Sequence, residues 1–381
     1  MKITLIGTLP PIKALSPYCY YLANALSKKT NLEFINFKSI QPHFMYSGGP
    51  KEKKSYSFNN FEKSDVLSWY NPFSWIKAGI KAKGDIVHIQ HWQIYASLMY
   101  CFIIPIIKIR RKKIIISIHN ITPHTTDFPT VFLDKIFNKI IYRYANHFIV
   151  HNKRNKEKLL KLYKIDEKNI SIIPHGSILP YIKIKNISKE KARNNLNIPK
   201  DKKIILFFGY MWGYKGLDVL LKSLKTISKN NSNIVLLLAG QPLKDWKKYE
   251  KLIKENKLDN LIIRDLKYIP DSETEYYFTS SDLVVLPYKK SPFDTHGGVG
   301  ALAISFKKPM IVTDVGGLPE YVKDQKVIVQ PGNADELAKK IISVLKDKKL
   351  LEKLSKDSED LSKELSWVKI VDKTIEVYKK V

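Results

Sequence analysis

The strongest constraint on the fold is an alternation of short β-branched runs with longer amphipathic stretches, which continues over almost the whole chain. Runs such as Ile204–Phe208 and Ile234–Ala239 are apolar at nearly every position, as expected for parallel strands that are covered on both faces. The stretch Leu217–Lys229 between them has helical periodicity. This alternation predicts βαβ units and therefore parallel, doubly wound sheets. The 381 residues suffice for about two such domains.

Two series of strands are predicted, and the polar stretch Lys183–Lys203 separates them as a linker. The first series is Ile3–Ile6, Glu33–Asn36, Ile86–Gln90, Ile114–His119, His147–Val150 and Ile170–Ile173. The second is Ile204–Phe208, Ile234–Ala239, Leu261–Arg264, Leu283–Leu286, Met310–Thr313 and Val327–Val329. We expect one α/β domain over residues 1–182 and a second over residues 183–364, with a cleft between them. Ligands of such sheets bind in loops that follow the carboxyl ends of strands.

The charge is strongly basic, with 65 Lys and Arg against 36 Asp and Glu, a formal net charge of +29. Two explanations stay open, a selected basic surface and a drift that fills solvated faces with lysine. A nucleic-acid-binding protein is favoured only by the charge, because no recognised binding module is present. The two cysteines provide no disulfide framework, and the N-terminus lacks a signal-peptide pattern. We expect a cytoplasmic protein.

Glycine-rich loops follow three strands of the second series. The loop after Ile204–Phe208 carries Gly209 and then Lys215 at the start of a helical stretch. A helix N-terminus and an ammonium group together suit a phosphate, although an ordinary turn with a solvated lysine would have the same pattern. The other two loops contain Asp294, His296 and Gly297–Gly300, and Thr313–Glu320. Three loops that converge on one anion would be a stronger indication than any one of them.

In the first half, the loop Pro10–Pro17 and the segment His119–His124 follow strands at the corresponding edge. A lone histidine at a strand end is more often structural than functional. A metal site built from His88, His91, His119 and His124 is an open alternative, but no carboxylate joins them at ligand spacing. No Asp-x-Asp pair occurs, so the sequence does not indicate a Mg²⁺–diphosphate clamp.

Taken together, these loops resemble glycosyltransferase family 4, nucleotide-sugar-dependent enzymes with the GT-B fold of two Rossmann-like domains. The resemblance covers essentially the whole chain. Its motifs are LVVLPYKK…GGVGALAISFKKPMIVTDVGGLPEYV, FFGYMWGYKGLDVLLKSL, IIPHGS and ISIHNITPH. It implies that residues 365–381 form a closing helix on the N-terminal domain. It further implies sugar transfer with retention of anomeric configuration and without a metal cofactor, in polysaccharide or glycoconjugate synthesis.

The resemblance also implies roles for residues. The expected catalytic residues are His119, Asp294 and Lys215, of which Lys215 meets the charge of the leaving nucleotide. The expected donor-binding residues are Lys13, Ala14, Gly209, Tyr210, Lys215, Ile269, His296, Gly297, Gly298 and Val299. The expected acceptor side consists of His91, His119, Asn120 and His124.

The sequence departs from the family pattern at Leu302, where a ribose-binding glutamate is usual, and at Tyr210–Trp212, where an arginine is usual. Two alternatives therefore stay open: a GT-B epimerase or phosphorylase, and a catalytically weak protein that binds a nucleotide sugar. The acceptor is expected to be a glycan or a lipid-linked glycan. Lysines and aromatic residues alternate in residues 51–83, and Lys108–Lys113 is basic. This composition favours contact with an anionic inner membrane face, although the aromatic residues could instead belong to the core.

Overall fold

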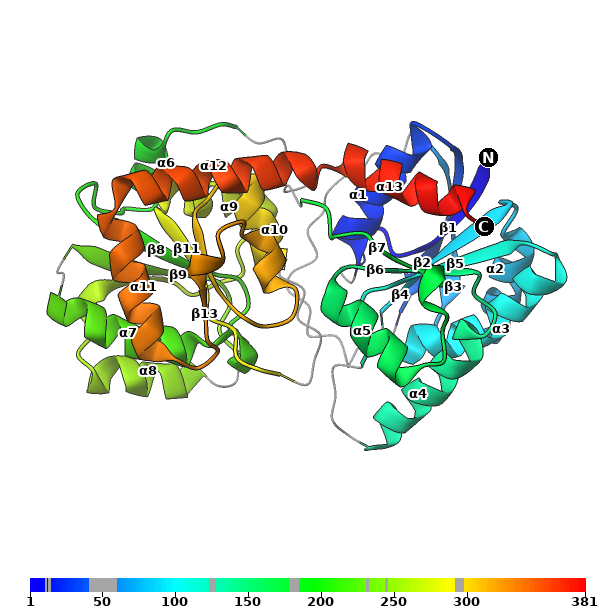
Figure 1. Ribbon diagram of the computed structural model, residues 1–381, viewed down its shortest axis with the longest axis horizontal. Coiled ribbons are helices and arrows are strands. Elements are labelled where there is room, and N and C mark those ends of the chain that lie inside the picture. Colours follow the sequence, from blue (N-terminus) through cyan, green and yellow to red (C-terminus); the bar gives the residue numbers. More distant parts are fainter. Residues whose placement is uncertain are drawn as a thin grey trace. The chain divides into compact units, whose positions relative to one another are not determined.

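The computed structural model describes residues 1–10, 12, 15–40, 60–92, 94–122, 128–177, 185–230, 233–243, 246–291 and 298–381. The described chain divides into two compact units (Figure 1). The N-terminal unit contains Met1–Gly176 and Leu365–Val381, and the C-terminal unit begins at Ser177 and continues to Glu364. The first unit therefore ends shortly before the boundary expected at residue 182. No helix within the described ranges is long and apolar enough to cross a membrane.

The N-terminal unit is a parallel α/β sheet covered by helices on both faces. Its strands are β1 (Lys2–Gly7), β2 (Asn31–Ser39), β3 (Glu62–Ser68), β4 (Ile86–His91), β5 (Lys113–Ile118), β6 (His147–Val150) and β7 (Ile170–Ile172). Its helices are α1 (Ser16–Ser27), α2 (Pro72–Lys81), α3 (Ile94–Ile109), α4 (Phe128–Tyr142), α5 (Lys153–Leu162) and α13 (Trp367–Lys379). The strand order is β3-β2-β1-β4-β5-β6-β7. The predicted strands of the first series are all present.

The two faces of this sheet have separate cores. One contains side chains of α2, α3 and α4 with alternate residues of the strands, such as Ile116 and Ile118. The other contains side chains of α1 and α13, including Ile370 and Tyr378, packed on Ile3 and Leu5 of β1. The last helix thus lies beside α1 on the N-terminal sheet (Figure 1).

The C-terminal unit is a second parallel sheet, in the order β10-β9-β8-β11-β12-β13. Its strands are β8 (Lys203–Phe208), β9 (Ile234–Ala239), β10 (Ile262–Asp265), β11 (Leu283–Leu286), β12 (Met310–Thr313) and β13 (Ile328–Val329). Its helices are α6 (Lys189–Asn195), α7 (Leu217–Asn230), α8 (Trp246–Glu255), α9 (Asp271–Ser280), α10 (Gly298–Ser305), α11 (Ala334–Lys346) and α12 (Lys348–Glu364). These strands confirm the second predicted series.

Two details differ from the sequence-based expectation. Strand β3 was not predicted, because its sequence EKSDVLS is polar at most positions, as an edge strand can be. The stretch Lys183–Lys203 is not a plain linker, because it contains α6, which packs against α9. Ser188 caps that helix by accepting a hydrogen bond from the amide of Lys191.

Candidate functional site

Lys215 lies beyond the carboxyl end of β8, in the short 3-10 turn Gly213–Lys215 that precedes α7. Its side chain is 7% exposed, and its Nζ donates a hydrogen bond of 3.4 Å to the carbonyl of Phe208. A Cβ atom at Gly209 would lie only 3.1 Å from this Nζ, so the ammonium group lies directly against the glycine. Burial lowers the pKa of Lys215 to about 8. No carboxylate of the described chain pairs with it, so the position favours an anion supplied by a ligand.

Three glycines allow the loops after β8, β9 and β11 to pack backbone against backbone. Gly209 has a φ of +91° and its amide donates to the carbonyl of Ala239 at 2.8 Å. A Cβ at Gly240 would lie 2.0 Å from the carbonyl oxygen of Gly209. A Cβ at Gly216, whose φ is +72°, would lie 1.9 Å from the carbonyl oxygen of Pro287. Larger residues would therefore separate the loops that surround Lys215.

The start of α10 lies at the same corner of the C-terminal unit. Val299 is 8% exposed, and its Cγ2 atom is 3.8 Å from the position that a Cβ of Gly209 would take. The first amides of a helix have no partners within the helix and carry partial positive charge. Gly298 is exposed, and a Cβ there would meet no atom within 4 Å. The structure therefore brings together Gly209, Lys215 and the first turn of α10, which we name the anion corner.

Hydrogen bonds from neighbouring elements hold the loop that leaves β11. The Thr313 hydroxyl, at the end of β12, donates to the carbonyl of Tyr288 at 2.7 Å. The Lys289 amide donates to the carbonyl of Tyr214 at 2.7 Å, and the Lys289 ammonium pairs with Asp218 at 3.1 Å. The loop is thus fixed both to β12 and to the turn that carries Lys215.

Two further predicted donor residues lie at this edge of the sheet. Ile269 is 8% exposed and follows β10. Its neighbour Tyr268 has its ring centroid 6.4 Å from that of Tyr210, which follows β8. The structure thus places Tyr210 and the Ile269 loop beside each other. Their contact with a nucleotide stays a prediction.

In the N-terminal unit, His119 belongs to a buried chain of polar side chains. One ring nitrogen, Nε2, contacts the side-chain oxygen of Gln90 at 2.9 Å, and the other, Nδ1, contacts Nε2 of His151 at 3.0 Å. Gln90 also contacts His88, whose Nδ1 lies 2.6 Å from the hydroxyl of Tyr378 on α13. His119 is 2% exposed. Side chains of its own unit thus engage both ring nitrogens, and its expected catalytic role stays a prediction.

The other described residues of the expected acceptor side also have partners within the unit. His91 is 1% exposed, and its Nε2 lies 2.7 Å from the hydroxyl of Ser97. Burial lowers the pKa of His91 to about 4, so its ring is neutral. The Asn120 side-chain amide donates to the carbonyl of Trp92 at 2.8 Å. Both residues fix the ends of β4 and β5, and their contact with an acceptor is untested.

Comparison with known proteins identifies the family. The model of the glycosyl transferases group 1 matches residues 188–360, and the model of Glycosyltransferase Family 4 matches residues 17–177. Between them the two models cover most of both units. The chain belongs to the family-4-like glycosyltransferases.

Individual relatives are distant. An uncharacterized glycosyltransferase of Methanocaldococcus jannaschii is 28% identical over 61% of this chain, and the match spans only 59% of that relative's length. A D-inositol 3-phosphate glycosyltransferase of Corynebacterium glutamicum is 23% identical, with 75% of this chain and 70% of that protein covered. The structure of HepE from Anabaena, solved with UDP, has a TM-score of 0.75 at 14% identity and covers both chains fully. This structural likeness shows the GT-B fold.

Several predicted site residues of this chain lie outside the described ranges: Lys13, Ala14, His124, Asp294, His296 and Gly297. Their roles stay predictions. Within the described ranges, no group of three or more His, Cys, Asp or Glu side chains is arranged to hold a metal ion.

The structure also shows site residues that the sequence did not single out. Gln241 follows Gly240 after β9, and its carbonyl accepts from the Met211 amide at 3.1 Å. The side-chain oxygen Oε1 of Gln241 is buried and has no hydrogen-bond partner within the described chain. Such an acceptor is costly unless a ligand or water donates to it. The only signal for Gln241 in the sequence was Gly240, which precedes it at the end of a strand. His151, the partner of His119, had no such signal in the sequence.

Proposed function

We propose that this glycosyltransferase moves a sugar from a nucleoside-diphosphate sugar to a glycan or lipid-linked acceptor, in the synthesis of a cell-surface polysaccharide or glycoconjugate. The observation that carries the proposal is the anion corner. There a buried ammonium group, with no carboxylate partner among the described residues, lies against a glycine backbone, beside the first turn of α10. HepE, which shares the fold, was solved with UDP and with UDP-glucose. These complexes support a uridine diphosphate sugar as the first donor to test.

Breaking the bond between the sugar and the diphosphate leaves negative charge on the departing oxygen. We propose that Lys215 and the amides at the start of α10 stabilise this charge, because preorganised donors of this kind act most strongly where charge develops. The absence of an Asp-x-Asp pair from the sequence supports a reaction without a metal clamp. We therefore expect transfer to continue in EDTA. From the family resemblance we also expect retention of anomeric configuration, which NMR of the product would establish.

A thermal-shift screen against nucleotide sugars identifies the donor, because a ligand that binds the folded state raises its melting temperature. With that donor, Lys215→Ala should lower the rate of transfer by about two orders of magnitude. The control is Lys308→Met. Lys308 is partly buried, and burial lowers its pKa to about 8 as well, but it precedes β12, at the amino end of that strand. Near-wild-type turnover in Lys215→Ala would reject the proposed site.

An assay with the donor alone separates transfer from epimerisation. An epimerase would change the sugar of the donor without an acceptor, whereas a transferase would need one for stoichiometric turnover. A protein that binds the donor but gives no product with any acceptor would be a catalytically silent member of the family.

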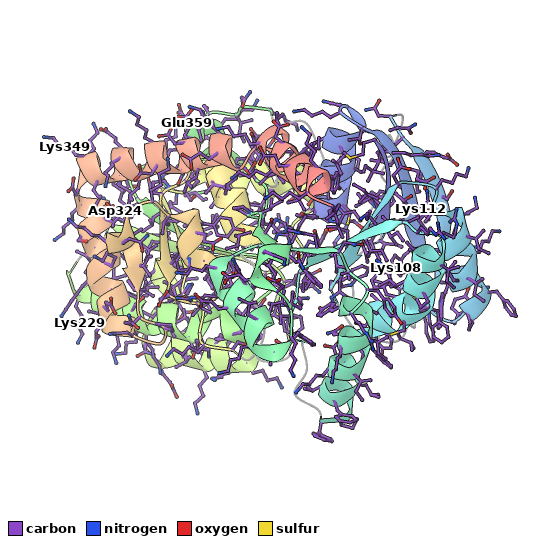
Figure 2. All side chains as sticks on the ribbon, turned by 45° about the vertical axis from the view of Figure 1, so that its right-hand side comes forward. Lys108, Lys112, Lys229, Asp324, Lys349 and Glu359 are labelled. Atoms are coloured by element: carbon purple, nitrogen blue, oxygen red, sulfur yellow. The ribbon has the colours of Figure 1, made fainter. Side chains whose placement is uncertain are left out.

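We further propose that the protein works in the cytoplasm, at the inner face of an anionic membrane. Among the aromatic side chains of residues 51–83, Trp75 belongs to the core, whereas Tyr70 and Phe73 are 64% and 81% exposed. Lys108 and Lys112 lie on the surface of the same unit, at and just beyond the end of α3 (Figure 2). Exposed aromatic side chains and surface lysines on one unit support interfacial binding. Flotation of the full chain with anionic vesicles tests this, and no binding at low or physiological salt would reject it.

A further inference from the structure

The polar side chains around His119 form one continuous chain of contacts through the interior of the N-terminal unit. Its members come from α13, from β4 and from the residues that follow β5, β6 and β7, in the order Tyr378, His88, Gln90, His119, His151 and Ile173. The successive contacts measure 2.6, 3.1, 2.9, 3.0 and 3.0 Å, and the last of them is made with the backbone carbonyl. The other members contribute side chains that are at most 2% exposed. Every link is therefore a buried hydrogen bond whose direction has to be consistent with its neighbours.

The carbonyl at the end of the chain determines where the protons lie. A carbonyl only accepts, so Nδ1 of His151 carries a proton and donates it to Ile173. In a neutral imidazole the other nitrogen is then an acceptor, and the proton in the contact between His151 and His119 belongs to Nδ1 of His119. The second ring nitrogen of His119, Nε2, is therefore bare and accepts a hydrogen bond from the amide of Gln90.

The orientation of the Gln90 amide decides whether the chain carries a charge. In the structure its oxygen faces His119, and this orientation needs two protons on His151, which is a cation at a site that is only 2% exposed. A half-turn about the Cγ–Cδ bond exchanges the amide oxygen and nitrogen in place and removes that need. The oxygen then accepts from Nε2 of His88, whose Nδ1 accepts from the hydroxyl of Tyr378. Burial lowers the pKa of His88 to about 3, which agrees with a neutral chain.

The plane of the His119 ring is restrained as well. Tyr18 of α1 packs against it with ring centroids 4.6 Å apart and an angle of 81° between the planes. The same tyrosine ring contacts His151 at 5.4 Å. Packing and hydrogen bonds at both nitrogens thus give the His119 ring one position and one state of protonation.

We propose that Gln90 and His151 are positioning residues for His119, and that they hold its ring neutral with the proton on Nδ1. The inference rests on the proposed function and on the part expected of His119 in it, and it adds the residues through which His119 is held. A group that is fixed before the reaction needs no reorganisation as the transition state forms. Loss of its supports should therefore lower kcat and leave KM for the donor nearly unchanged.

A buried polar chain could also serve stability alone, and the chain offers a matched control for that alternative. His147 begins β6, the strand that His151 follows, and is 3% exposed. Its Nε2 lies 2.9 Å from the hydroxyl of Ser171 on the neighbouring strand. His147→Leu thus removes a buried, hydrogen-bonded histidine from the amino end of the same strand, away from His119.

The test combines NMR of the full chain, isotopically labelled in its histidine rings, with steady-state kinetics. The NMR needs no substrate, because the two nitrogens of a neutral imidazole differ strongly in chemical shift and those of an imidazolium are alike. Loss of signals in His119→Gln assigns them. The variants are Gln90→Met, His151→Leu and His151→Gln, the last of which keeps an amide oxygen that can accept from His119. Circular dichroism and calorimetry with UDP verify that each variant is folded and binds the nucleotide.

We expect one neutral form of His119, protonated on Nδ1, in wild type and in His151→Gln, and a mixture of forms in Gln90→Met and His151→Leu. With UDP-glucose, or the donor that the thermal-shift screen identifies, kcat should fall about tenfold in the latter two and recover in His151→Gln. KM for the donor should stay within about twofold in all of them. The control His147→Leu should lose stability but keep kcat and the His119 signals.

An imidazolium at His119 in wild type, or a proton on its Nε2, would overturn the assignment. An unchanged kcat in Gln90→Met and His151→Leu, or an equal loss in His147→Leu, would show that the chain serves stability alone and would overturn the positioning role. A wild-type protein that has the expected NMR signals but transfers no sugar would refute the proposed function and still support the proton assignment.

Discussion

The protonation of Lys215 provides a direct test of the anion corner. Lys215 is 7% exposed, and its ammonium group has one long contact, with the carbonyl of Phe208. Burial lowers its pKa to about 8, compared with 10.5 in water. A bound diphosphate would place negative charge beside the ammonium and raise that pKa again. The affinity for the diphosphate should therefore depend on pH in a range where few other side chains titrate.

The size and sign of the effect follow from linkage. Below pH 8 the free protein already holds the proton, so binding costs no protonation. Above pH 8 a proton must be taken up on binding, and the affinity falls as the pH rises. If a bound diphosphate restores the pKa from about 8 to the ordinary lysine value of 10.5, Kd for UDP should rise about tenfold between pH 7 and pH 9. The phosphates of UDP are largely ionised over this range and add little to the dependence.

Isothermal titration calorimetry with UDP at pH 7, 8 and 9 measures the effect. In Lys215→Met we expect weaker binding at pH 7 and a nearly flat dependence on pH. In Lys308→Met, which removes a lysine whose pKa is also lowered to about 8 but which lies at the amino end of β12, the tenfold dependence should remain. A flat profile in wild type, or the same slope in Lys215→Met, would refute the contact between this ammonium and the diphosphate.

Three further predictions concern the framework around the site. Gly216→Ala would place a Cβ atom 1.9 Å from a carbonyl oxygen, whereas Gly332, which has a similar positive φ, has open space around the position of its Cβ. Urea unfolding should therefore show a loss of unfolding free energy in Gly216→Ala that is several times the loss in Gly332→Ala. Tyr378→Phe should lower the unfolding free energy by about 1–3 kcal/mol, because the nearby ring nitrogen of His88 loses its partner. Burial lowers the pKa of His88 to about 3 and of His91 to about 4, so the unfolded state binds more protons in acid. Urea midpoints should therefore fall as the pH is lowered from 6.5 to 4. The buried carboxyl of Asp134 opposes this in part, because its pKa is raised to about 6 and the folded state therefore binds its proton more tightly.

The fold could be predicted because the apolar strands are long, regular and separated by amphipathic helices. Runs such as Ile234–Ala239 fit a parallel strand that is covered on both faces and few other structures. The failures occur where this signal is weak. Strand β3 pairs only at the edge of its sheet and carries Glu62, Lys63 and Asp65, so its sequence resembles a loop. Helix α6 is a short segment rich in lysine and asparagine, whose main local signal is its Ser188 cap.

The candidate site could be predicted only in part. Glycines at strand ends indicated where loops approach each other, and Gly209 and Lys215 do lie together. The sequence could not reveal which polar atoms would find partners. His119 looked available at a strand end, but its nitrogens contact Gln90 and His151, residues that are distant in the sequence. Whether a buried polar side chain finds a hydrogen-bond partner depends on its neighbours in the tertiary structure, and the local spacing of residues does not contain that information.

Two lysines of the C-terminal unit, Lys215 and the partly buried Lys308, illustrate the same point. The pKa of each is lowered to about 8, so the pKa alone does not distinguish Lys215 from Lys308. The Lys308 ammonium donates to two carbonyls, at 3.1 and 3.3 Å, and lies close enough to Asp282 for the carboxylate to raise its pKa. Lys215 has one contact of 3.4 Å and no carboxylate within the described chain to balance its charge. The cost of burying a charge is therefore left uncompensated at Lys215 but not at Lys308. A bound diphosphate would compensate it.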